Sequence, residues 1–129
     1  MLTRHNPGAV APPFSRYSHG VEAPAGARWL HVSGQVGVGP DGTLADSPRG
    51  QIERAFANML GVLEAAGMGP HDLVKVTVFL TRREDIADYR EVRDRAFRGA
   101  EPASTLLLIS GLARPEWVVE VEAVAAAKA

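Results

Sequence analysis

The sequence predicts an α+β fold in two layers, with one mixed sheet and two helices packed on one face of that sheet. Three observations lead to this prediction. Strand-like and helix-like segments alternate through the middle of the chain, pairs of strand-like segments stand at both ends, and each helical segment carries one apolar stripe. The predicted element order is ββαβαββ, and the length predicts a single domain over residues 1–129.

The first third of the chain predicts an irregular arm followed by two strands. Residues 1–13 hold three prolines and no periodic pattern, which favours an arm without regular structure. Strand-like runs then cover Arg16–Glu22 and Ala27–Ser33, with a turn-like Pro-Ala-Gly between them, so we expect a hairpin. The glycine-rich stretch Gly34–Gly42 predicts a loop with unusual backbone geometry.

Two amphipathic helices and one strand are predicted in the middle of the chain. The first helix begins at Asp46–Pro48, where a capping side chain precedes a proline, and ends at Gly67. Its apolar stripe predicts contact with the core rather than with a cofactor. A strand over Leu73–Thr81 alternates apolar and polar residues, and the second helix covers about Arg83–Phe97.

The C-terminal third predicts two more strands. They cover Ala103–Ile109 and Trp117–Val124 and are joined by a connection that contains Gly and Pro, so a second hairpin is expected. Side chains alternate between the faces of a strand, which places Glu120 and Glu122 on one face among valines. A carboxylate on a central strand must be solvated, paired, or used in chemistry.

Composition and charge narrow the class of protein. The formal net charge is −1 and the charged residues are spread along the chain, which argues against binding nucleic acid or a membrane surface through bulk charge. The absence of cysteine excludes disulfides, thiolate catalysis and thiolate metal sites. No apolar run fits a signal peptide or a membrane span, so we expect a cytoplasmic protein. The four histidines show no metal-binding spacing, and no metal site is predicted.

Several short motifs together resemble the RidA/YjgF family, including its early tyrosine segment, its Ser-Gly-Gln turn and its C-terminal signature. The matching segments are Tyr17 with Gly20, Ser33–Gln35, Glu64–Gly67, Val76–Phe79, Pro102–Ala103, Ser110–Leu112 and Val119–Val121. The resemblance extends over nearly the whole chain. It implies a chorismate-mutase-like fold and a homotrimer with small-molecule pockets between its subunits. The run Leu106–Ile109, apolar at every position, agrees with burial in such an assembly.

The resemblance implies a cofactor-free enamine or imine deaminase. Glu120 matches the glutamate that holds or activates a water in a cleft between subunits, and imine hydrolysis needs a group that manages the proton of such a water. Tyr17 matches the tyrosine of the pocket, and Ser33 with Gly34 matches the turn whose backbone approaches the substrate. Without the resemblance, a solvated strand carboxylate, a core tyrosine and an ordinary loop would explain these residues.

The sequence departs from the deaminases of this family at Ser104. Those proteins have Arg directly after Pro-Ala, where it clamps the substrate carboxylate in bidentate fashion, and serine cannot form that ion pair. Ser104 and Leu106 share a strand face, which predicts a less cationic and more apolar pocket. Arg90 matches a position near the pocket that is often Asn, so either it replaces the clamp or it keeps its head group in water. Arg114 is a further candidate.

Three functions remain open from the sequence. The first is hydrolysis of a reactive enamine or imine, which Glu120 and Tyr17 favour. The second is a non-catalytic module that binds or senses a small molecule, which Ser104 favours. The third, an endoribonuclease or translation inhibitor, is a label often given to the family, but the chain has no basic stripe that would support it. We therefore expect a small-molecule ligand, no cofactor and no nucleic acid or membrane partner.

Overall fold

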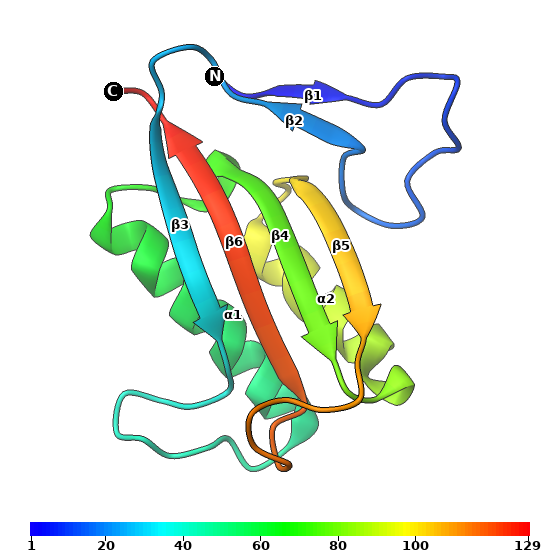
Figure 1. Ribbon diagram of the computed structural model, residues 1–129, viewed down its shortest axis with the longest axis vertical. Helices are drawn as coiled ribbons and strands as arrows, with labels where there is room; N and C mark the ends of the chain where they lie inside the picture. Colours follow the sequence, from blue (N-terminus) through cyan, green and yellow to red (C-terminus); the bar gives the residue numbers. More distant parts are fainter.

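The computed structural model describes residues 1–129 and has a four-stranded mixed sheet with both helices on one face (Figure 1). The strands are β3 (Arg28–Gln35), β4 (Leu73–Leu80), β5 (Ala103–Leu108) and β6 (Val119–Ala127), arranged in the order β3-β6-β4-β5. β4 and β5 run parallel, and the other neighbours are antiparallel. The predicted α+β class, the mixed sheet and the one-sided pair of helices are confirmed.

Helix α1 spans Pro48–Ala65 and begins at the predicted cap. The Ser47 side chain accepts a hydrogen bond from the backbone N–H of Gly50 at 3.0 Å, and Pro48 occupies the first turn, where a backbone N–H would lack a partner. Gly67 follows the helix with a φ of +70°, a conformation that glycine adopts without steric cost. The buried side of α1 carries Ile52, Ala55, Phe56, Met59 and Leu63.

Helix α2 spans Ile86–Phe97 and follows a short 3-10 turn, η2 (Arg83–Asp85). The predicted segment is therefore helical throughout, with a tighter first turn, as is common at helix starts. The buried Asp85 carboxylate accepts two hydrogen bonds from Arg82, at 2.9 and 2.8 Å, which fixes the entry into the helix. A second 3-10 turn, η1 (Pro70–Asp72), leads from α1 into β4.

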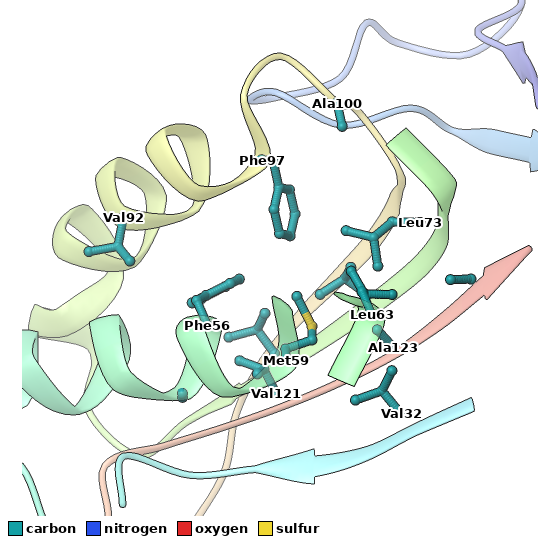
Figure 2. Close-up of a cluster of buried hydrophobic side chains, with 14 of the residues drawn as sticks. Val32, Phe56, Met59, Leu63, Leu73, Val92, Phe97, Ala100, Val121 and Ala123 are labelled. Carbon is teal, nitrogen blue, oxygen red and sulfur yellow. The ribbon is translucent and has the colours of Figure 1, made fainter. Parts of the chain in front are cut away.

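The core lies between the helices and the sheet (Figure 2). Three aromatic rings meet at its centre, with centroid distances of 6.2 Å between Phe56 and Tyr89 and 5.6 Å between Phe56 and Phe97. On β6 the residues Val119 and Val121 are fully buried in this core. The predicted alternation is thus confirmed, because the glutamates between and after these valines face away from the helices.

Both predicted hairpins are wrong. The segment Gly20–Glu22 (β2) pairs with β1 (Thr3–His5), a strand within the predicted irregular arm, and not with β3. β4 lies between β5 and β6, which therefore do not pair. The α2 crossover returns the chain so that β5 runs parallel beside β4, and β6 then occupies the other edge of β4. Turn residues predict that a chain reverses, but not which strand it pairs with.

The face of the sheet without helices is partly polar. Its central rows carry Lys75, Thr77, Thr105 and Glu122, and the Lys75 Nζ donates a hydrogen bond to Thr105 Oγ1 at 2.6 Å. At the end of β5, Leu107 and Leu108 are 43% and 38% exposed, so the run predicted to be buried on both faces remains open in one chain. None of the helices has the length and apolar character needed to cross a bilayer.

Candidate functional site

The sheet divides the predicted site residues into two groups on opposite faces. Ser104 lies beside Val76, and Val76 is 1% exposed on the helix side. Glu120 lies beside Phe79 on the face without helices. The two groups are also separated by two strand spacings, or roughly 10 Å sideways. Glu120 and Ser104 of one chain therefore cannot contact the same small molecule.

Glu120 lies against Gly34 on the face without helices. The pairing of β3 with β6 shifts register between Val32 and Gln35, and this irregularity brings the Gly34 backbone to the glutamate. A Cβ added at Gly34 would collide with Oε2 of Glu120, so glycine is needed here for space. The Glu120 carboxylate is half-buried and has no hydrogen bond or ion pair within the chain.

Ser33 stands next to this corner and is exposed. Its carbonyl oxygen accepts a hydrogen bond from Gln35 Nε2 at 3.2 Å. It lines a hollow of about 250 Å³ on the same face, together with His31, Lys75, Thr77 and Glu122. Neither Glu120 nor Gly34 lines that hollow, so the three predicted residues are neighbours rather than walls of one cavity.

The other four predicted residues line one cavity of about 160 Å³ on the helix side of the sheet edge. It lies between the segment that precedes β2, helix α2 and strand β5. The lining residues are Phe14, Ser15, Tyr17, Tyr89, Arg90, Arg93, Ser104 and Leu106. Tyr17, Arg90, Ser104 and Leu106 therefore line one cavity, as expected for residues of one pocket.

A buried serine holds the tyrosine segment against β5. The Ser18 N–H donates to the carbonyl of Pro102 at 3.1 Å, and the Ser18 hydroxyl donates to the carbonyl of Glu101 at 2.5 Å. These bonds place Tyr17 beside the start of β5. The Tyr17 hydroxyl accepts a hydrogen bond from the backbone N–H of Phe14 at 3.3 Å, which closes the loop over the cavity.

Arg93 is a cavity residue that sequence reasoning missed. It is only 2% exposed, and its Nε and Nη2 donate to Asp94 Oδ1 at 2.9 and 2.8 Å. Its Nη1 donates to Ser15 Oγ and to the Tyr89 hydroxyl, each at 3.3 Å, and the guanidinium carbon lies 5.3 Å from the Tyr89 ring centroid. The sequence contains a pattern that could have identified it. Arg93 follows Tyr89 by four residues, so both side chains lie on the same side of the helix.

Arg90 is exposed at the same cavity and has no carboxylate partner. The acidic residues beside it on α2 are occupied by Arg49 of α1, which donates to Asp88 at 3.0 Å and to Glu91 at 2.8 Å. The bonds to Glu91 and Asp88 raise the pKa of Arg49 above its ordinary value. Arg90 therefore keeps an uncompensated positive charge at the cavity.

The remaining candidates lie elsewhere. Arg114 does not line the cavity; its guanidinium stacks on the Trp117 ring at 5.5 Å, in the connection between β5 and β6. The largest cavity, about 420 Å³, lies beside the β1–β2 pair and is lined by Arg4, His71 and Glu101, none of which was predicted. No group of three or more His, Asp or Glu side chains is placed to hold a metal ion.

Comparison with known proteins decides the family. The family model described as Endoribonuclease L-PSP matches residues 8–127. The chain belongs to the Endoribonuclease L-PSP family. Relatives of this family member include proteins named as deaminases. The 2-iminobutanoate/2-iminopropanoate deaminase of Mus musculus is 34% identical over 127 residues, covering 95% of this chain and 87% of the mouse protein. Protein DfrA of Myxococcus xanthus is 35% identical over 123 residues, covering 92% and 88%.

Several solved structures share the fold described above. The Rid-family protein YyfB from Yersinia pestis has a TM-score of 0.86 at 30% identity, covering 96% of this chain and 97% of YyfB. TdcF from Escherichia coli, solved with bound serine, has a TM-score of 0.74 at 28% identity, covering 98% and 96%. The resemblance to RidA/YjgF proteins is confirmed.

Proposed function

We propose that this protein hydrolyses a reactive enamine or imine and releases ammonia, in a site that two copies of the chain build together. Relatives named as deaminases support the reaction class. The main observation behind this proposal is that the site residues of one chain lie on opposite faces of the sheet, so that one chain alone cannot form the complete site. Glu120 and Gly34 lie on one face, and the cavity with Tyr17 and Ser104 opens on the other side.

A cyclic assembly would unite these two half-sites. In a ring of three copies, the cavity of one chain faces the Glu120 corner of the next, and the interface repeats until the ring closes. Three equivalent sites result. The exposed Leu107 and Leu108 at the end of β5 support contact with a neighbour, because apolar side chains on an open strand edge are normally covered.

In the proposed reaction, water adds to the C=N carbon while Glu120 takes up one of its protons. The first proton passes from Glu120 to the nitrogen and gives a carbinolamine. Glu120 then takes the proton of the carbinolamine hydroxyl and delivers it to the nitrogen as the C–N bond breaks, so that ammonia leaves and a C=O bond remains. The carboxylate is suited to this role because nothing within the chain pairs with it and because it is half-buried. Tyr17 closes the cavity wall, Ser104 and Leu106 form its floor on β5, and Ser33 and Gly34 border the water side.

A second function, binding or sensing of a small molecule without turnover, is favoured by one observation. Ser104 stands where the deaminases that the sequence resembles carry Arg, so the strand offers the ligand a hydroxyl and no charge. A protein of this kind would bind product-like acids and show no hydrolysis.

An assay of ammonia release tests the proposed reaction. An amino-acid oxidase generates the imine in situ, and Glu120→Gln is compared with wild type. We expect a loss of roughly 100-fold or more, because general acid–base groups contribute about 10²–10⁴. The matched control is Glu122→Gln on the same face of β6, which should retain activity. Equal loss in both variants would refute the role of Glu120, and an inactive wild type that binds 2-oxo acids would favour the second function.

A further inference from the structure

The cavity beside α2 has the chemistry of an anion-binding site. Its lining holds two guanidinium groups, four hydroxyl groups and no carboxylate. The guanidinium groups belong to Arg90 and Arg93, and the hydroxyls to Ser15, Tyr17, Tyr89 and Ser104. Guanidinium groups only donate hydrogen bonds, and hydroxyls donate readily to an anion. A ligand here is therefore met mainly by donors.

Arg93 is the fixed donor of this cavity. Asp94 holds the Nε and Nη2 edge of its guanidinium, which turns Nη1 toward Ser15 and Tyr89, and both of these residues line the cavity. The two bonds from Nη1 are long, at 3.3 Å each. Charge-assisted bonds to a carboxylate are shorter and stronger, about 2.7–2.9 Å. A bound carboxylate would thus replace weak neutral partners of Nη1.

Arg90 provides the net charge. The Asp94 carboxylate compensates the charge of Arg93. This ion pair therefore orients a hydrogen-bond donor toward the cavity but adds no net charge to it. Arg90 has no ion pair, because its acidic neighbours on the helix bind other arginines. Arg49 binds Asp88 and Glu91, and Arg93 binds Asp94. The cavity therefore combines an oriented guanidinium with an uncompensated one, three residues apart on α2.

We propose that helix α2 supplies the anion-binding subsite of this protein, with Arg93 as the fixed donor and Arg90 as the unpaired cation for the carboxylate of a small acid. This inference rests on the proposed function in one respect only, which is that the bound acid is a 2-imino or 2-oxo acid. The cavity of about 160 Å³ has room for the carboxylate end of a small acid. Phe14 and Leu106 form the apolar part of the wall and favour a compact alkyl substituent.

Binding of 2-oxobutanoate and of its uncharged methyl ester to the full-length protein tests this subsite by titration calorimetry. Wild type should bind the acid at least about tenfold more tightly than the ester, since one charge-assisted hydrogen bond corresponds to roughly that factor. Arg90→Ala should reduce the preference for the acid, because only Arg93 then remains, and should leave the affinity for the ester unchanged. Arg95→Ala is the matched control, because Arg95 lies on the same helix and is 72% exposed outside the cavity.

Asp94→Asn tests Arg93 without removing a buried side chain. The amide oxygen still accepts from the guanidinium, while the compensating charge disappears, so the affinity for the acid should rise and that for the ester should not. Equal affinity of wild type for acid and ester, or no change of their ratio in both Arg90→Ala and Asp94→Asn, would overturn the subsite. This binding experiment does not depend on turnover. A protein that binds the acid preferentially but shows no hydrolysis would contradict the proposed reaction and still support the anion-binding subsite.

Discussion

At the scale of single residues, the corner formed by Gly34 and Glu120 shows how backbone space sets the position of a carboxylate. The collision of an added Cβ with Oε2 means that any side chain at position 34 must displace Glu120. The glycine is not required by its backbone angles, because its φ is not positive. The requirement comes from close approach between β3 and the β6 side chain.

If Glu120 acts as proposed, Gly34→Ala should lower the proposed deaminase activity by about tenfold or more, because small misplacement of a catalytic group is costly. The measurement is initial-rate kinetics with imine generated in situ, alongside urea unfolding. Gly61→Ala is the control. It lies in α1 with nothing near the added methyl, so it should keep activity and stabilise the fold by roughly 0.5–1 kcal/mol. Full activity of Gly34→Ala would show that Glu120 need not stay in this position.

At the scale of elements, α1 is connected to the segment that leads into β6 by one buried side chain. The Gln51 Nε2 donates to the Glu116 carbonyl at 3.1 Å, and its Oε1 accepts from the Val118 N–H at 3.0 Å. Because Glu120 follows Val118 by two residues, this amide also helps to fix the start of the strand that carries Glu120.

Gln51→Leu keeps a similar shape but leaves two backbone groups without partners. We expect the free energy of unfolding to fall by about 1–3 kcal/mol, the usual cost of a polar group left unsatisfied. Chemical denaturation measures the change, with Glu53→Gln on the exposed side of α1 as control. An unchanged midpoint would mean that water replaces both bonds.

At the scale of the whole molecule, assembly is the central prediction. Sedimentation equilibrium should give about three times the mass of one chain, because the proposed function requires a closed ring to complete each site. Leu107→Glu should shift the protein toward single chains, since it places a charge on an exposed apolar strand position next to the Glu120 row. A wild-type protein that stays monomeric at micromolar concentration would contradict both the assembly and the shared site.

The family description includes endoribonuclease, and the whole-molecule charge bears on that activity. With a formal net charge of −1 and 6% aromatic residues, the purified protein should bind RNA weakly and without the steep salt dependence of phosphate contacts. Filter binding at two salt concentrations measures this. Tight, salt-sensitive binding together with cleavage that is lost in Glu120→Ala would reverse the order of the proposed functions.

The sequence by itself determined the two helices, the class of fold and the face on which Glu120 lies. These features depend on local patterns, such as the Ser47 cap, the apolar stripe of α1 and the alternation along β6. Tyr17, Arg90, Ser104 and Leu106 could be collected as candidates because family motifs or strand alternation mark their positions. Their meeting in one cavity was not predicted by local patterns, because it depends on the contact of the Tyr17 segment with the start of β5, which Ser18 makes through Glu101 and Pro102.

Only the tertiary structure decided which strands pair and what Arg93 contacts. β4 separates β5 from β6, and β1 takes the partner predicted for β3. Strand pairing depends on contacts between segments far apart in the chain, and local turn residues do not specify them. Arg93 meets Ser15 across 78 residues of chain, and no local pattern reports such a contact. The sequence also did not show that Glu120 and Ser104 lie on opposite faces of the sheet. Alternation tells which residues of one strand share a face, but not whether that face is the same one as on another strand.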